Sequence, residues 1–182
     1  GNSSASTAIT FTLDTVAPTT PVVSLLTDTG TPPAGSAADK ITSVETLTVT
    51  PEAGALVEYK VGSGAWTTTA PTGLAEGTQS VLVRQTDVVG NVSSTNTFTF
   101  TLDKTVVAPT VALANDTGSS NTDKKTFDPT LSITSETGAQ VQYSIDGGTT
   151  WVNSMPNLTD GDKAIKVRQT DVAGNVSAVT DY

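Results

Sequence analysis

Thr86-Asp87-Val88-Val89-Gly90-Asn91-Val92-Ser93 recurs in this chain as Thr170-Asp171-Val172-Ala173-Gly174-Asn175-Val176-Ser177. Each copy follows a Val-Arg-Gln triplet, at Val83–Gln85 and at Val167–Gln169. The copies lie about 84 residues apart, which is the length of a small domain. The chain therefore contains two tandem copies of one structural unit.

Further matches extend this repeat over nearly the whole chain. The first copy carries extra residues around Thr31–Gly35. The matched pairs are Asp28–Gly30 with Asp116–Gly118, Asp39-Lys40 with Asp123-Lys124, Glu52–Ala55 with Glu136–Ala139, Tyr59 with Tyr143, and Trp66 with Trp151.

The matches also predict the domain boundaries. Residues 1–13 parallel the segment that starts at Gly90, so we expect them to be the last strand of a preceding repeat. Repeat 1 is predicted to span residues 14–102, and repeat 2 residues 103–182 with a short last strand. The start of the chain lacks the pattern of a signal peptide, which favours an internal fragment of a longer protein.

The spacing of apolar residues predicts the fold class. In Thr97–Leu102 every second residue is apolar, as in a strand with one buried face. Leu47–Val49 and Leu131–Ile133 alternate likewise, and glycine-rich turn signals occur at Gly62–Gly64 and Asp146–Gly148. We therefore expect an all-β chain of two tandem immunoglobulin-like Greek-key β-sandwiches.

Composition narrows the possible functions. The chain has no Cys and no His, which removes thiol nucleophiles, disulfides and the commonest general base. Its net charge of −9 disfavours a nucleic-acid partner. No apolar run is long enough to span a membrane. The sequence thus predicts neither an enzyme, nor a nucleic-acid-binding protein, nor a direct membrane insertion.

The combined motifs resemble the bacterial Ig-like repeats of giant repeats-in-toxin and other non-fimbrial surface adhesins. The resemblance rests on Asp14–Thr19, the two Asp-Thr-Gly motifs, Asp146–Trp151 and Gln169–Asn175. It implies cell adhesion and biofilm proteins at the bacterial cell surface, in which such repeats act as extracellular spacers. It also implies that calcium stiffens the junctions, that neighbouring repeats are the partners, and that other domains of the parent protein bind the ligand.

Loop topology independently suggests calcium sites. In an Ig-like sandwich, the entering linker and two of the loops meet at one pole. Each of these segments carries an acidic residue here, and converging carboxylates are stabilised by a hard cation such as Ca²⁺. The expected ligands are Asp14, Glu52 and Asp87 in repeat 1, and Asp103, Glu136 and Asp171 in repeat 2.

The opposite pole of each repeat also carries acids. Asp28 and Asp39 are expected near the outgoing linker at Asp103, and Asp116 and Asp123 are expected to face a following repeat. Ordinary turn chemistry remains open for all these residues, because an Asp side chain in a turn bonds nearby backbone amides. The short Pro-containing linkers, Val16–Pro21 and Val107–Thr110, are predicted to be semi-rigid.

Other functions were weighed against the spacer. Trp66 and Trp151 are expected to anchor the cores, but exposed, co-planar aromatic residues would indicate carbohydrate or surface binding. Carboxylate catalysis is less consistent with acids that both repeats share. Ice binding by Thr97, Thr99 and Thr101 is disfavoured because alternating Thr is the ordinary solvent face of a strand and Ig-like sheets are twisted. Residues 1–13 could also complete the second repeat of a neighbouring chain by strand addition.

Overall fold

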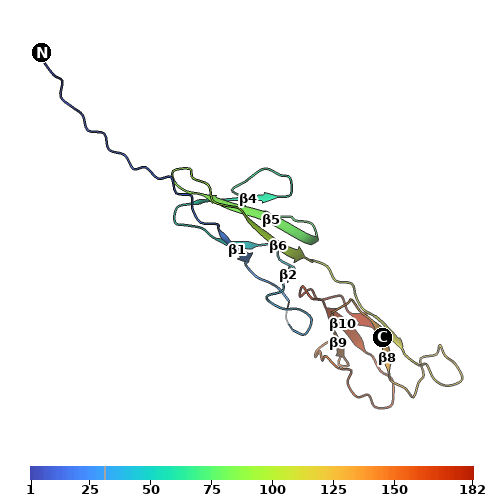
Figure 1. Cartoon of the computed structure of the whole chain (residues 1–182). Helices are drawn as coiled ribbons and strands as arrows, with labels where there is room; N and C mark the ends of the chain where they lie inside the picture. Colours follow the sequence, from blue (N-terminus) through green and yellow to red (C-terminus); the bar gives the residue numbers. More distant parts are fainter. Residues whose placement is uncertain (31) are drawn as a thin grey trace. The chain divides into compact units, whose positions relative to one another are not determined.

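The computed structural model describes residues 1–30 and 32–182 (Figure 1). Every regular element in this part of the chain is a β-strand, which confirms the all-β prediction. The inserted loop Thr31–Ala38 begins at Thr31, which lies outside the described residues. No helix in the described residues is long and apolar enough to cross a membrane.

The described residues of repeat 1 form six strands in two sheets. In one sheet, β1 pairs with β3. The other sheet has the order β2-β6-β5-β4, and β2 runs parallel to β6. The bounds are β1 Val22–Leu25, β2 Ile41–Thr42, β3 Leu47–Thr50, β4 Leu56–Val61, β5 Gly77–Thr86 and β6 Asn96–Leu102.

The core of repeat 1 is formed by alternate residues of neighbouring strands. On β6, Phe98, Phe100 and Leu102 are 8%, 2% and 0% exposed. On β5, Val81 and Val83 are completely buried. Because side chains alternate between the two faces of a strand, this pattern confirms the buried face that the sequence predicts for Thr97–Leu102.

The described strands of repeat 2 follow the order of repeat 1 except that β2 has no counterpart, and repeat 2 has a smaller core. Strand β7 pairs with β8, and the second sheet has the order β11-β10-β9. Its buried hydrophobic residues are Ile165, Val167 and Ala173. The bounds are β7 Thr110–Leu113, β8 Leu131–Thr134, β9 Gln140–Ser144, β10 Lys166–Thr170 and β11 Thr180–Asp181.

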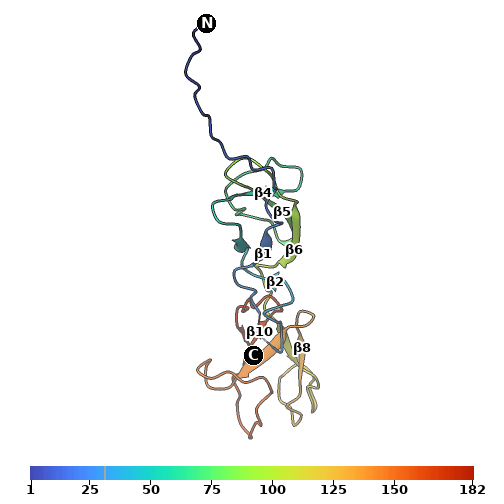
Figure 2. The same cartoon turned by 60° about the vertical axis from the view of Figure 1, so that its left-hand side comes forward.

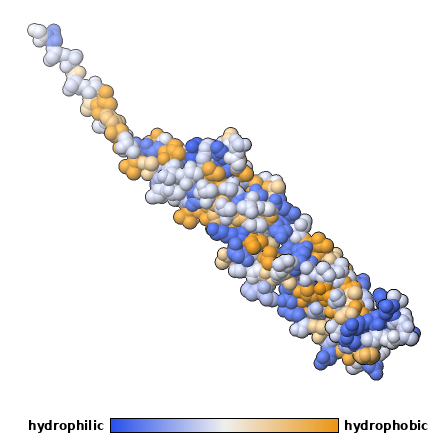
Figure 3. Space-filling model, turned by 45° about the vertical axis from the view of Figure 1, so that its right-hand side comes forward, coloured by the Kyte–Doolittle hydropathy of each residue, from blue (hydrophilic) through white to orange (hydrophobic). Residues whose placement is uncertain are grey.

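Residues 1–13 form no strand, and all of them are exposed. In both cartoon views this segment, drawn in dark blue, runs free of the strands (Figures 1 and 2). Ile9, Phe11 and Leu13 are 85%, 81% and 76% exposed. The projecting segment therefore presents hydrophobic side chains to solvent, seen in orange in Figure 3.

The backbone divides into two compact units that do not follow the repeat boundary. One comprises Gly1–Ser24, Thr48–Ala70 and Val81–Phe98. The other comprises Leu25–Leu47, Pro71–Ser80 and Thr99–Tyr182. The second unit thus contains the long loop of repeat 1 together with the whole of repeat 2.

Candidate functional site at the junction of the repeats

A buried glutamine holds the linker that enters repeat 2. Gln169 is 1% exposed, and its Nε2 donates a hydrogen bond of 2.6 Å to the carbonyl oxygen of Val107. Its Oε1 accepts a hydrogen bond from the amide of Glu136 at 2.9 Å. Glu136 Oε1 in turn accepts the amide of Val107 at 2.6 Å. These three hydrogen bonds of Gln169 and Glu136 are called the linker clamp below.

Repeat 1 holds its own entering linker in the same way. Gln85 Nε2 donates to the carbonyl of Thr19 at 2.7 Å, and Gln85 Oε1 accepts the amide of Glu52 at 2.8 Å. Glu52 Oε1 accepts the amide of Thr19 at 2.6 Å. That backbone hydrogen bond lowers the pKa of Glu52, although the negative charge of Asp87 opposes the shift.

The role of these glutamines was not predicted from the sequence. A signal was present, because Gln85 continues the buried positions of Val81 and Val83 along β5. A polar residue in a buried position needs hydrogen-bond partners, and here the partners are the linker and the loop beside it.

The predicted metal ligand Asp87 braces its own turn. Its Oδ1 accepts the amides of Val89, Gly90 and Asn91 at 2.9, 2.8 and 2.8 Å, and its Oδ2 accepts Asn91 Nδ2 at 2.8 Å. Burial works against ionisation, but these hydrogen bonds outweigh it and lower the pKa of Asp87. Asn91 Nδ2 also lies 3.3 Å from the carbonyl oxygen of Asp14.

The corresponding turn of repeat 2 is built on Asp171. It accepts the amide and the Nδ2 of Asn175, both at 2.8 Å. Asn175 Nδ2 donates to the carbonyl oxygen of Asp103 at 2.9 Å. In both repeats, the Asp-Asn pair therefore ties the turn to the first residue of the repeat, Asp14 or Asp103.

The turn of repeat 2 also contacts the long loop of repeat 1. Thr29 Oγ1 donates a hydrogen bond of 2.5 Å to the carbonyl oxygen of Ala173. The hydroxyl is held in place because it accepts the amide of Ser43 at 2.7 Å. Ala173 is completely buried, whereas Val88 and Val89 in the matching turn of repeat 1 are 81% and 56% exposed.

Three glycines permit this close approach. A Cβ atom at Gly30 would lie 2.4 Å from the carbonyl oxygen of Val172, and one at Gly35 would lie 2.0 Å from it. A Cβ atom at Gly174 would lie 2.9 Å from the amide nitrogen of Gly30. These distances are too short for any side chain, so the two loops pack backbone against backbone. At the counterparts Gly118 and Gly90, a Cβ atom would meet nothing within 4 Å.

Repeat 1 also holds the start of the linker that leads to repeat 2. The amide of Lys104 donates to Glu76 Oε1 at 2.9 Å, and Lys104 Nζ forms an ion pair with Glu45 Oε2 at 3.2 Å. The backbone amide of Gly73 is the main reason why the pKa of Glu45 is lowered. The linker is therefore held from both of the repeats that it joins.

Several acidic residues gather around this linker. The pKa of Asp103 is raised, first by burial and then by the negative charges of Asp171, Glu76 and Glu136. The amide of Thr105, which donates to Asp103 Oδ1 at 3.2 Å, opposes this shift. The predicted trio of repeat 2 is thus brought into one neighbourhood, together with Glu76, which the sequence analysis did not include.

The remaining predicted ligands brace their own loops. Asp28 Oδ2 accepts the amide of Lys40 at 2.8 Å, and Asp116 Oδ2 accepts the amide of Lys124 at 2.8 Å. The Oδ1 atoms of both these aspartates are buried without a hydrogen-bond partner. Asp39 Oδ1 and Asp123 Oδ1 accept the amides of Ile41 and Lys125 at 2.9 and 3.1 Å.

The acidic side chains near Asp103 have the chemistry that a hard cation needs, but not the arrangement. Carboxylate oxygens that repel one another match the ligand preference of Ca²⁺. Within residues 1–30 and 32–182, however, no group of three or more acidic side chains is placed closely enough to hold a metal ion. The acids are near one another, but they do not form a preformed metal cage.

The tryptophans lie beneath arginine side chains. Arg84 Cζ lies 4.3 Å from the centroid of the Trp66 ring, and Arg168 Cζ lies 4.2 Å from that of Trp151. Both rings are half-buried, so neither is the fully buried core anchor that the sequence analysis expected. A guanidinium group covers one face of each ring, which leaves at most the other face for stacking a sugar.

Comparison with known proteins supports the Ig-like fold of repeat 1. Residues 24–104 match the bacterial Ig-like domain. This Ig-like domain is a non-catalytic type of module. It covers most of repeat 1, and it supports the bacterial Ig-like resemblance of the sequence motifs.

The chain is also similar to three proteinases of Lactococcus lactis subsp. cremoris. These are the PI-type and PII-type proteinases and the PIII-type proteinase of strain SK11, each 31% identical over 191 residues. The matches cover 96% of this chain but only 10%, 10% and 9% of the respective relatives. The chain therefore spans about one tenth of the length of these relatives.

Proposed function

We propose that this chain is a non-catalytic spacer of a bacterial surface protein, located outside the cell, and that its partners are neighbouring repeats. The direct contact of Gly30 and Gly35 with the Val172–Gly174 turn carries this proposal, because it gives the repeats a packed junction. The match to a bacterial Ig-like domain and the similarity to much longer proteins support a structural module within a large chain.

The spacer works by restricting rotation at the linker. Glu76 and Glu45 hold its first residues from repeat 1, while Glu136 and Gln169 hold Val107 from repeat 2. A linker held at both ends and a loop contact beside it leave the repeats little freedom to swivel. Distance and force are then transmitted along the chain.

Rotational diffusion tests this proposal. NMR relaxation of backbone amides is expected to give one common correlation time for both repeats. Gly30→Ala is expected to separate them into two shorter correlation times, because the added methyl group cannot fit against Val172. Two independent correlation times in the unmodified chain would contradict the spacer mechanism.

We also propose that Ca²⁺ binds beside Asp103 and stiffens the junction further. Burial raises the pKa of Asp103 most, and the negative charges of Asp171, Glu76 and Glu136 add to the shift, so a cation would relieve an existing repulsion. The buried, unpaired Oδ1 atom of Asp28, in the long loop of repeat 1, is a further acceptor that a hard cation suits. When bound, the ion would supply charge neutralisation and oxygen coordination, while the chain's own hydrogen bonds continue to orient the linker.

Asp103→Asn is expected to stabilise the chain at neutral pH in chelator, by up to about 1 kcal/mol, since solvent screens this partly exposed group. A carboxyl group with a raised folded-state pKa costs stability while it is ionised. Relative to Asp103→Asn, the unmodified chain should therefore regain stability as the pH falls through the folded-state pKa of Asp103, and the difference should level off below the unfolded value. Thermal unfolding of both proteins between pH 7 and pH 3 checks this difference, because carboxyl groups with a lowered pKa, such as Asp87, destabilise both proteins alike as the pH falls.

Calcium should make the unmodified chain more stable than Asp103→Asn, which is the reverse of their stabilities in chelator. Millimolar Ca²⁺, the range of extracellular modules, is expected to raise the melting temperature of the unmodified chain more than that of Asp103→Asn. Asp160→Asn removes a charge from an exposed loop and should respond like the unmodified chain. An equal response of all three proteins to Ca²⁺, or no response, would rule out the proposed calcium site.

A further inference from the structure

Repeat 2 contains two Asp-Gly steps, and both lie outside its strands. They are Asp146-Gly147, in the turn after β9, and Asp160-Gly161, in the segment before β10. A protein backbone rearranges most readily at such a step, because glycine has no side chain to shield its own amide nitrogen from the preceding carboxyl group. The two steps differ in how firmly the structure holds the aspartate.

The side chain of Asp146 is held by several hydrogen bonds. Its Oδ1 accepts the hydroxyl of Ser144 at 2.8 Å and the amides of Thr149 and Thr150 at 3.1 and 2.9 Å. Its Oδ2 accepts the hydroxyl of Thr150 at 2.6 Å. These hydrogen bonds, with that of the Thr150 hydroxyl foremost, lower the pKa of Asp146. The carboxylate is therefore fixed in its turn and is not free to react with the amide of Gly147.

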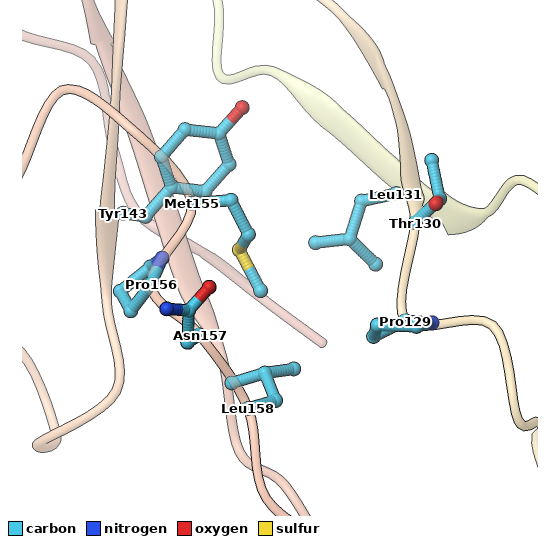
Figure 4. A pocket seen from close by; sticks show the side chains of 8 residues that line it. All are labelled: Pro129, Thr130, Leu131, Tyr143, Met155, Pro156, Asn157 and Leu158. Atoms are coloured by element: carbon cyan, nitrogen blue, oxygen red, sulfur yellow. The ribbon is translucent and has the colours of Figure 1, made fainter.

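Asp160 lacks this support. In the segment before it, Met155 and Leu158 line a pocket (Figure 4). Beyond this pocket, residues 159–164 are all exposed. In the described part of the chain, no group donates a hydrogen bond to the Asp160 carboxylate. Its side chain can therefore rotate towards the amide nitrogen of Gly161.

A lysine side chain lies against the peptide bond between Asp160 and Gly161. Lys163 Nζ donates a hydrogen bond of 3.2 Å to the backbone carbonyl oxygen of Asp160. A Cβ atom at Gly161 would lie 4.0 Å from the same nitrogen. Because the ammonium group is positive, it withdraws electrons from this peptide group. The Gly161 amide becomes more acidic, and the Asp160 carbonyl carbon becomes more electrophilic.

We propose that Asp160-Gly161 is a site of spontaneous conversion to isoaspartate and that Lys163 promotes the conversion. The Gly161 nitrogen loses its proton and bonds to Cγ of Asp160, one water molecule leaves, and a five-membered succinimide ring forms. Water then opens the ring. Attack at the former backbone carbonyl of Asp160 gives isoaspartate, whereas attack at Cγ restores aspartate. One water molecule leaves and one enters, so the reaction needs no other reactant.

Lys163 acts in both stages of this reaction. While the ring forms, its positive charge stabilises the amide nitrogen as the proton leaves. While the ring opens, the carbonyl oxygen that Lys163 contacts carries the developing negative charge, and a donor placed in advance stabilises that charge. Lys163 should therefore increase both the rate and the share of isoaspartate in the product.

Peptide mapping of the full chain after several weeks at neutral pH tests the proposal, with electron-transfer fragmentation to distinguish isoaspartate from aspartate. Isoaspartate should form at residue 160 about ten times faster than at residue 146, or more, because hydrogen bonds worth about 1.4 kcal/mol slow a reaction tenfold. A protein isoaspartate methyltransferase should methylate the peptide that contains residue 160.

Lys163→Gln should slow the conversion about two- to fivefold, as expected for an exposed charge, and lower the share of isoaspartate. Lys125→Gln is the matched control, because it removes an equally exposed charge of repeat 2 and should leave the conversion unchanged. Asp160→Asn is the positive control for detection. It forms the same ring with loss of ammonia, so freshly purified protein should convert faster than the unmodified chain.

Isoaspartate that forms no faster at residue 160 than at residue 146 overturns the proposal. A Lys163→Gln variant that reacts like Lys125→Gln overturns it as well, because the contact with the Asp160 carbonyl would then have no chemical effect. The proposal is independent of the spacer function, since the peptide map reports the chemistry of one loop and not the motion of the repeats.

Discussion

Gly30→Ala should lower the free energy of unfolding by about 2–3 kcal/mol more than Gly118→Ala does. The added Cβ atom would lie 2.4 Å from the carbonyl oxygen of Val172, which is backbone and cannot rotate away. The loops must separate, and the chain then loses the hydrogen bond from Thr29 to Ala173 and the burial of Ala173. Chemical denaturation measures the difference.

Gly118 is a closely matched control for this change. Each glycine is the third residue of an Asp-Thr-Gly motif, and the φ values are 102° for Gly30 and 109° for Gly118. Replacement by alanine therefore costs similar backbone strain at both sites, on the order of 1–2 kcal/mol. Only Gly30 lies against another loop, so the difference isolates the junction. Equal losses in the two variants would show that the contact contributes nothing to stability.

Gln169→Met is expected to destabilise repeat 2 by about 2–5 kcal/mol, because it leaves two partly buried backbone groups without the partner that they have in Gln169. Methionine has a similar length, so little cavity forms. The carbonyl of Val107 loses its donor at 2.6 Å, and the amide of Glu136 loses its acceptor at 2.9 Å. Thermal unfolding should show a fall in the melting temperature of about 10 °C or more.

Gln79→Met controls for the general effect of this substitution. Its Nε2 donates to the carbonyl of Ala75 at 2.8 Å in an exposed setting, where water can replace the lost hydrogen bond. The control should change stability by less than about 0.5 kcal/mol. Amide hydrogen exchange at Val107 should accelerate only in Gln169→Met. A Gln169 variant as stable as the control would refute the linker clamp.

Periodicity was sufficient to predict the fold. The alternation in Thr97–Leu102 predicted which side chains are buried, because a strand with one buried face allows only one arrangement of Phe98, Phe100 and Leu102. The recurrence of long motifs predicted two tandem copies of one structural unit. The same comparison identified residues 1–13 as a strand-like segment, although they form no strand in this chain.

The junction was less predictable, because its residues have two possible roles with the same sequence signature. Asp87 uses the carboxylate oxygens that would bind a metal to brace its turn. Gly30 has a positive φ, which by itself explains a glycine in the sequence. The sequence therefore gives no sign that Gly30 also lies close to Val172. The contact of Glu76 with the linker depends on a loop that lies far away in sequence, and no short-range pattern reports it.

The contact between the repeats is tested most directly by distance measurement in solution. The chain contains no Cys, so Thr78→Cys and Ser132→Cys place one spin label on each repeat at exposed strand positions. In chelator, pulsed electron paramagnetic resonance should give a single narrow distance distribution that Gly30→Ala broadens and Gly118→Ala leaves unchanged. A broad distribution in the chain without either glycine substitution would contradict a junction held by direct contact.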